Sequence, residues 1–139
     1  MVKELNRYTS NEFHDWQRTN LPSRFVIQDI DTWALVVSDS EKNYEPICLI
    51  ELKRSYIEPE QWKPFLADKR SYLAIHNLAK LANLPLYIIY FKKGTVISDD
   101  SLFAVLQVDK VSDIPQWIDY KKTLYKAQDF KKIFPNLTR

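Results

Sequence analysis

The shortage of glycine is the feature that most restricts what this chain can fold into. One glycine, Gly94, occurs among the 139 residues. Walker loops and dinucleotide-binding fingerprints each need several glycines, because their backbone must approach phosphate groups closely. The chain also contains one cysteine, Cys48, and two histidines, which are too few for an ordinary four-ligand structural zinc site. The side chains that remain for chemistry are mainly carboxylates, lysines and hydroxyls.

Length and composition predict a single domain that spans residues 1–139. Hydrophobic residues make up 45% of the chain and aromatic residues 14%, which is enough to build a core. No apolar run approaches the ~20 residues needed to cross a bilayer, and the N-terminus lacks the apolar segment of a signal peptide. The lone cysteine cannot form an internal disulfide. We therefore expect a cytoplasmic protein without a membrane contact.

Apolar periodicity and turn residues predict an α/β fold. A helix that begins near Thr9 is followed by two or three strands, a long helix, two further strands and a final amphipathic helix. This order, α-β-β-β-α-β-β-α, predicts a central mixed sheet flanked by helices. The expected ranges are 25–30, 32–37 and 47–52 for the first strands, 60–83 for the long helix, 84–91 and 102–108 for the later strands, and 115–134 for the last helix.

The most basic part of the chain is the C-terminal segment 110–139. It holds seven lysine or arginine residues against three aspartates, which gives a local balance of +4 where the whole chain has +2. Basic side chains of this kind are typical of a solvated helix surface and, less often, of a surface that follows phosphates. The same segment is rich in aromatic residues: Trp117, Tyr120, Tyr125, Phe130 and Phe134.

Three ionisable residues stand in or beside runs of strand-forming residues. Glu51 and Lys53 are two residues apart in one run, and Asp31 ends an earlier run. Charged groups inside a sheet are costly unless something uses them. If the two runs form an antiparallel hairpin around the polar turn between them, Asp31 faces Lys53 and Trp33 faces Glu51. Side chains alternate faces along a strand, so both acids and the lysine then share one face, and Asp29 has the parity of Asp31.

Two acids and a lysine gathered in one place suit a hard divalent cation and a phosphate. Two carboxylates bind Mg²⁺ at ~2.0–2.1 Å while waters keep the remaining positions; Mn²⁺ is the expected substitute. Such a metal polarises the scissile phosphate and lowers the pKa of a bound water. Lys53 can stabilise the negative charge that grows in the transition state. The residues therefore predict Asp31 and Glu51 as metal ligands and Lys53 as a catalytic group.

Asp31, the polar hairpin, and Glu51-Leu52-Lys53 followed by a helix and a strand resemble the PD-(D/E)XK nuclease superfamily. Restriction endonucleases and archaeal Holliday-junction resolvases belong to that superfamily. The resemblance covers roughly residues 8–92 and implies a restriction-endonuclease-like core. It also implies that the upstream aspartate and the glutamate bind the metal and that the lysine is catalytic.

Three further positions follow from the same resemblance. Ile30 stands where the family has proline, which leaves Asp29 as a rival metal ligand. Some members carry a metal-assisting glutamate on the first helix, and Glu12 is the candidate, although it also fits a capping box that begins at Thr9. Some members carry a glutamine or tyrosine on the helix after the lysine, and Gln61 is the candidate there.

The expected function is a Mg²⁺-dependent nuclease that hydrolyses phosphodiester bonds in DNA, although the residues do not distinguish DNA from RNA. A small single domain without a separate sequence-reading module favours structure-directed cleavage or action as a homodimer. Two alternatives stay open. One is a catalytically inactive nuclease-fold protein that binds nucleic acid or a protein partner, and the other is an interaction protein of unrelated fold that docks through its C-terminal helix. Candidate contacts to a nucleic-acid backbone are Arg54, Lys63, Lys69 and Arg70.

Overall fold

The computed structural model describes residues 12, 15, 16, 18–22, 32–37, 44–94, 96–112 and 116–137. The strand predicted at 25–30 therefore lies outside the described residues, and so do Asp29 and Asp31. At the N-terminal end, the described residues from Glu12 to Asn20 are helical, in agreement with the predicted first helix.

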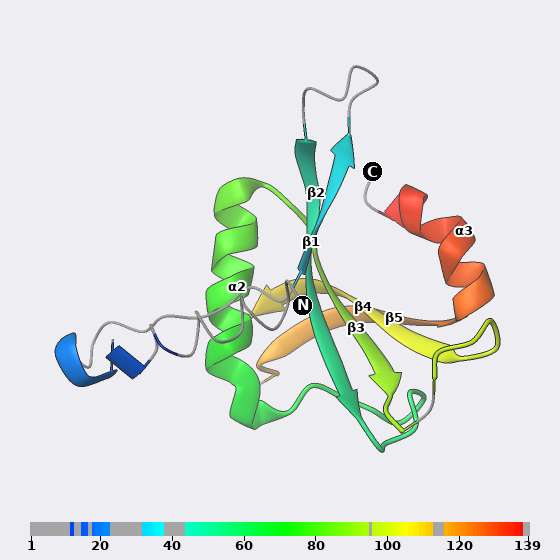
Figure 1. Ribbon diagram of the computed structural model, residues 1–139, viewed down its shortest axis with the longest axis horizontal. Coiled ribbons are helices and arrows are strands. Elements are labelled where there is room, and N and C mark those ends of the chain that lie inside the picture. Colours follow the sequence, from blue (N-terminus) through cyan, green and yellow to red (C-terminus); the bar gives the residue numbers. More distant parts are fainter. Residues whose placement is uncertain are drawn as a thin grey trace.

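A five-stranded mixed sheet forms the centre of the molecule (Figure 1). Its strands lie in sequence order, and only β2 and β3 run parallel to each other. The parallel pair is joined by a crossover that contains a helix, as a parallel connection requires. The predicted mixed α/β architecture is confirmed. The strands are β1 (Thr32–Val37), β2 (Tyr44–Ser55), β3 (Leu86–Lys92), β4 (Leu102–Val111) and β5 (Ile118–Lys126).

Two helices cover opposite faces of the sheet (Figure 1). The helix α2 (Lys69–Ala82), preceded by the short 3₁₀ helix η1 (Leu66–Asp68), packs on one face. The helix α3 (Ala127–Leu137) packs on the other face. At the end of α2, Asn83 adopts a left-handed conformation, and its N–H bonds the carbonyls of Ala79 and Lys80, which satisfies carbonyls that the helix leaves open.

The alternation of side chains along β3 divides the core into two layers. Leu86, Ile88 and Tyr90 point toward α2, whereas Tyr87 and Ile89 point toward α3. A strand covered on both faces needs apolar side chains at every position, and this explains the unbroken apolar run in the sequence. Among the described helices, none is long and apolar enough to span a membrane.

The long helix was predicted over 60–83, with Pro64 as an alternative start, and both predicted starts are too early. Regular helix begins only at Lys69, and residues 56–65 form turns and extended chain. Two causes are visible. Pro64 has no N–H to give to a helix, and Trp62 buries its ring against the sheet, where it stacks on Tyr90 with ring centroids 4.5 Å apart.

The predicted last helix at 115–134 is also wrong in its first half, because Ile118–Lys126 forms the edge strand β5. The spacing of Trp117, Ile118 and Leu124 fits a helical stripe, but the same segment alternates along a strand. Ile118 belongs to the core layer beneath α2, and Tyr125 packs into the layer beneath α3. Pairing with β4 along the whole strand stabilises the extended form, so only Ala127–Leu137 is helical.

The β1–β2 hairpin exists, but its register differs from the prediction by two residues. Thr32 pairs with Ile50, and Trp33 pairs with Leu49 rather than with Glu51. An irregularity between Ala34 and Leu35 shifts the remaining pairs. A shift of two keeps each residue of the first pairs on its predicted face. The described pairing ends at Thr32, so the predicted pair of Asp31 and Lys53 lies outside the described residues.

A buried histidine is hydrogen-bonded to the backbone at an irregularity in β4. Pairing between β4 and β5 shifts between Val108 and Lys110, and His76 of α2 hydrogen-bonds the backbone of the intervening Asp109. The imidazole is 7% exposed. Burial lowers the pKa of His76 below its ordinary value of 6.5, and the nearby Lys80 lowers it further, while Asp109 opposes the shift.

Acid should therefore destabilise the protein through His76. Protons bind the unfolded chain more readily than the folded one, so the free energy of unfolding falls as pH drops below 6.5 and through the folded pKa. Denaturant midpoints measured from about pH 7.5 to about pH 5.5 should show this loss. His76→Gln should flatten the profile, and Asn77→Gln, at the neighbouring exposed position of α2, should keep it. An unchanged profile in His76→Gln would contradict the assignment.

Candidate functional site

Glu51 and Lys53 project from the same face of β2, toward α2. Both residues have the parity of Leu49, which belongs to the core layer beneath that helix. On the parallel neighbour β3, Glu51 is in register with Ile88 and Lys53 with Tyr90. Glu51 is only 6% exposed, whereas the side chain of Lys53 is 29% exposed. The pair therefore runs from the buried interior toward the surface along one strand.

Two residues at the start of α2 surround the ammonium group of Lys53. Its Nζ lies 3.8 Å from Oδ2 of Asp68 and 5.4 Å from the centroid of the Tyr72 ring. Asp68 immediately precedes α2, where a negative charge is also favoured by the helix dipole. The face of an aromatic ring attracts a cation. Both contacts hold the ammonium group between β2 and the first turn of α2.

A hydrogen-bonded tyrosine fixes the chain just beyond Lys53. The hydroxyl of Tyr90 donates to the carbonyl oxygen of Ile57 at 2.6 Å and lies 2.6 Å from Oγ of Ser55. Since the tyrosine hydroxyl has one hydrogen, which goes to Ile57, Ser55 is the donor of the second bond. The segment that follows β2 is thereby tied to β3.

A lysine from the opposite edge of the sheet fixes the same segment further along. Nζ of Lys122 donates to the carbonyl oxygen of Trp62 at 2.8 Å and to that of Glu60 at 3.3 Å. Burial lowers the pKa of Lys122. Together with the stacking of Trp62 on Tyr90, these hydrogen bonds fix the position of the residues before α2. They therefore also fix the position of Asp68 relative to Lys53.

The other predicted site residues lie away from this pair or outside the described part. Glu12 is exposed in the N-terminal helical segment. Gln61 is exposed in a turn before η1, so it is not on the helix that follows the lysine. Asp29 and Asp31 are not among the described residues. The structure thus brings Glu51 and Lys53 together and leaves the predicted second acid undescribed.

The predicted nucleic-acid contacts are scattered over the surface. Arg54 has the opposite parity to Lys53 and lines a shallow hollow near Phe91. Lys63 and Arg70 are exposed, and Lys69 is half-buried at the start of α2. Of the four, Lys69 and Arg70 lie in the same turn of helix that begins beside Asp68.

Sequence reasoning missed Asp68 and Tyr72 as neighbours of the lysine. The resemblance called for a glutamine or tyrosine on the helix after Lys53, and Tyr72 meets that description, since it lies in the first turn of α2 with its ring facing the ammonium group. Because the helix was predicted to begin at residue 60, Gln61 was predicted for this position instead. Asp68 carries no sequence signal of its own beyond its position before α2.

Metal binding at this site needs oxygen donors in addition to Glu51. Within the described ranges no group of three or more histidine, cysteine, aspartate or glutamate residues is placed to hold a metal ion. The Asp68 carboxylate is engaged by Lys53. Glu51 is a hard oxygen ligand of the kind that Mg²⁺ prefers, and Asp31, the second acid predicted from the sequence, lies outside the described residues. No family model, curated protein or solved structure matches this chain.

Proposed function

We propose that this chain is a Mg²⁺-dependent nuclease that hydrolyses phosphodiester bonds in DNA. Glu51 and Asp31 are proposed as the metal ligands and Lys53 as the catalytic group. One observation carries the proposal: a buried carboxylate and a partly exposed ammonium group, which contacts Asp68 and Tyr72, lie on one face of a central strand. Burying a charge in a sheet costs several kcal/mol unless it is used or paired.

The topology around β2 supports the same reading. The strand that carries Glu51 and Lys53 follows a hairpin and leads through α2 to a parallel neighbour, β3. A restriction-endonuclease-like core would have this arrangement around its glutamate and lysine. The edge strand β5 and the helix α3 extend the sheet and cover its other face.

Each group has a definite task in the proposed reaction. When bound, Mg²⁺ would polarise the scissile phosphate and lower the pKa of the attacking water. Lys53 presents a positive charge that stabilises the growing negative charge on the phosphate. Asp68 and the Tyr72 ring hold that charge in place, so little reorganisation is needed when the phosphate arrives. Glu51, which is buried in the sheet, would be one ligand of the cation.

Cleavage of a panel of DNA substrates tests the proposal. Plasmid, single-stranded and branched DNA are incubated with the purified chain in Mg²⁺, in Mn²⁺ and in EDTA. Metal-dependent cutting of at least one substrate is expected, with branched or single-stranded DNA cut faster than duplex if recognition is structure-directed. Absence of cutting on every substrate, together with DNA binding that Glu51→Gln leaves unchanged, would replace the proposal by its alternative, a catalytically inactive nucleic-acid-binding protein.

Asp68 acts on the reaction through Lys53 and is therefore a positioning residue. Asp68→Asn keeps the shape but removes the charge, and the ion pair it breaks is partly exposed. Such pairs contribute up to about 1 kcal/mol, so kcat should fall about threefold to fivefold with KM nearly unchanged. The exposed Asp100→Asn is the matched control. Equal kcat values for the two variants would show that Asp68 has no part in positioning Lys53.

A further inference from the structure

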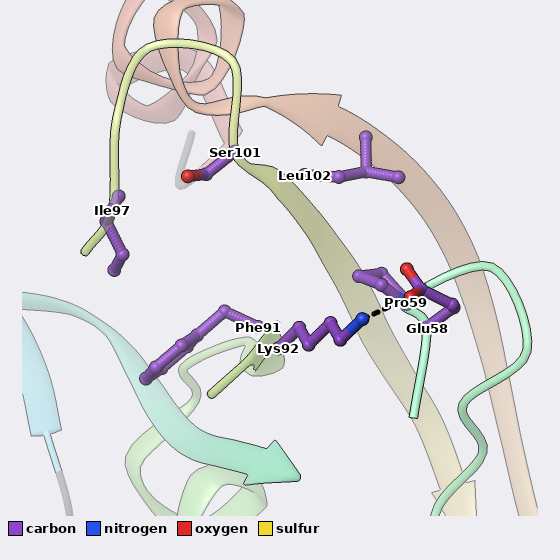
Figure 2. Close-up of a pocket in the computed structure, with 7 residues that line it drawn as sticks. All are labelled: Glu58, Pro59, Phe91, Lys92, Ile97, Ser101 and Leu102. Carbon is purple, nitrogen blue, oxygen red and sulfur yellow. Dashed lines mark hydrogen bonds and ion pairs between the residues drawn. The ribbon is translucent and has the colours of Figure 1, made fainter. Parts of the chain in front are cut away.

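A small pocket lies at the end of the sheet, between the segment that follows β2 and the β3–β4 connection (Figure 2). Its apolar walls are the ring of Phe91 and the side chains of Pro59, Ile97 and Leu102. Phe91 has the opposite parity to Tyr90 along β3, and it packs against Phe103. Lys92 and Leu102 have the opposite parity to Phe91 and Phe103 on the same two strands, so the pocket lies across the end of the sheet and not on one of its faces.

The polar part of the lining combines a donor with an acceptor. The ammonium group of Lys92 is paired with a carboxylate oxygen of Glu58, and Figure 2 shows this pair at one end of the pocket. Oγ of Ser101 accepts a bond from the N–H of Ser98 at 2.8 Å, which leaves its hydroxyl hydrogen to donate. A ligand edge that carries both donors and acceptors matches this lining.

Each wall is held by contacts outside the pocket. The carbonyl of Glu58 accepts the N–H groups of Gln61 and Trp62, at 2.9 and 3.1 Å. On the other side, the carbonyl of Ser101 accepts the N–H of Ala127 at 2.8 Å, which ties the β3–β4 connection to the start of α3. Because the walls are already ordered, a ligand can bind this pocket without the entropic cost of ordering them.

Size and charge select the ligand. The pocket has a volume of about 160 Å³, and a protein cavity of about 150 Å³ holds one benzene ring. A single six-membered ring therefore fits within this volume. The second ring of a purine would extend beyond it. The charged residues among the described lining are Lys92 and Glu58, which are paired with each other, so the lining carries no net charge. A neutral ring is favoured over an anion.

We propose that this pocket binds one pyrimidine ring, stacked on Phe91 with its polar edge toward Lys92, Glu58 and Ser101. A pyrimidine base is a neutral six-membered ring with donors and acceptors side by side, which is the combination that the walls and the ion pair fit. The ring can come from a free nucleoside or from an unpaired base of a nucleic-acid strand. Binding needs no metal and no cleavage, so it holds or fails separately from the proposed nuclease activity.

Titration of the ¹⁵N-labelled chain in EDTA tests the proposal, with thymidine, adenosine, oligo-dT and oligo-dA as probes. Thymidine should shift the amide signals of Phe91, Lys92 and Leu102 with a dissociation constant of about 1 mM. Ile97→Ala should weaken binding at least about fivefold, as expected for a lining side chain. Val96→Ala, which changes the neighbouring and more exposed residue outside the lining, should leave binding within about twofold.

The arms of the experiment separate the two sources of the ring. Saturation by thymidine and by oligo-dT identifies a base of a nucleic-acid strand as a competent ligand, and saturation by thymidine alone identifies a free nucleoside. Adenosine binding as tightly as thymidine would overturn the selection by ring size. Equal effects of Ile97→Ala and Val96→Ala, or no saturable shift at Phe91 and Lys92 with any probe, would overturn the pocket as the site.

Discussion

Replacing Lys53 with alanine is expected to lower the rate of metal-dependent DNA cleavage by a factor of about 10²–10³ at saturating Mg²⁺. The reason is that Lys53 supplies a positive charge on the face of β2 that carries Glu51, oriented by Asp68 and Tyr72. Glu51→Gln should cause a loss of at least similar size, because the neutral amide is a much weaker ligand for a hard cation. Single-turnover cleavage rates measure both effects.

Matched controls decide whether these losses are catalytic. Lys80→Ala removes an exposed lysine from α2 and should leave the cleavage rate within about twofold. Circular dichroism and unfolding midpoints must show that the Lys53 and Glu51 variants remain folded. If Lys53→Ala were folded and cleaved DNA at the wild-type rate, Lys53 would not be a catalytic residue.

Replacing Trp62 with alanine is expected to lower the free energy of unfolding by about 3–5 kcal/mol. Trp62 is 2% exposed, its ring stacks on Tyr90 at an interplanar angle of 12°, and it meets Phe65 edge to face. Removing the ring leaves a large cavity between the sheet and the segment before α2. The hydrogen bonds from Lys122 to the backbone do not compensate for the packing that is lost. Equilibrium urea unfolding measures the change.

Trp16→Ala is the matched control for Trp62→Ala, because it removes the same ring from a position that is 51% exposed. We expect it to change the free energy of unfolding by less than about 1 kcal/mol. If the two variants unfolded at the same urea concentration, Trp62 would not be the residue that anchors this segment.

The central strands were predictable because their sequence leaves little choice. Residues 84–91 are apolar at almost every position, a pattern typical of a buried strand, and the part of this run that follows Pro85 lies in β3. The pair of Glu51 and Lys53 was predictable for a related reason, since period-two alternation places both side chains on one face once the strand is assigned. That part of the candidate site depends on local sequence alone.

The features that were predicted wrongly depend on contacts between distant residues. The strand β5 has an apolar spacing that also fits a helix, and only its pairing with β4 decides between the two. The start of α2 depends on Trp62, whose ring finds Tyr90 across the sheet. The hairpin register also changes by one residue at an irregularity between Ala34 and Leu35, which period-two alternation does not predict. Tertiary contacts of this kind outweigh local propensity.

The proposed metal centre joins Glu51, which is described and buried, to Asp31, which the sequence alone identifies. A crystal structure of the chain soaked in Mn²⁺ tests that centre most directly. We expect an anomalous peak at about 2.1 Å from oxygens of both carboxylates, with Nζ of Lys53 on the same face of β2. Mn²⁺ absent from Glu51, or an Asp31 carboxylate on the α3 face of the sheet, would contradict it.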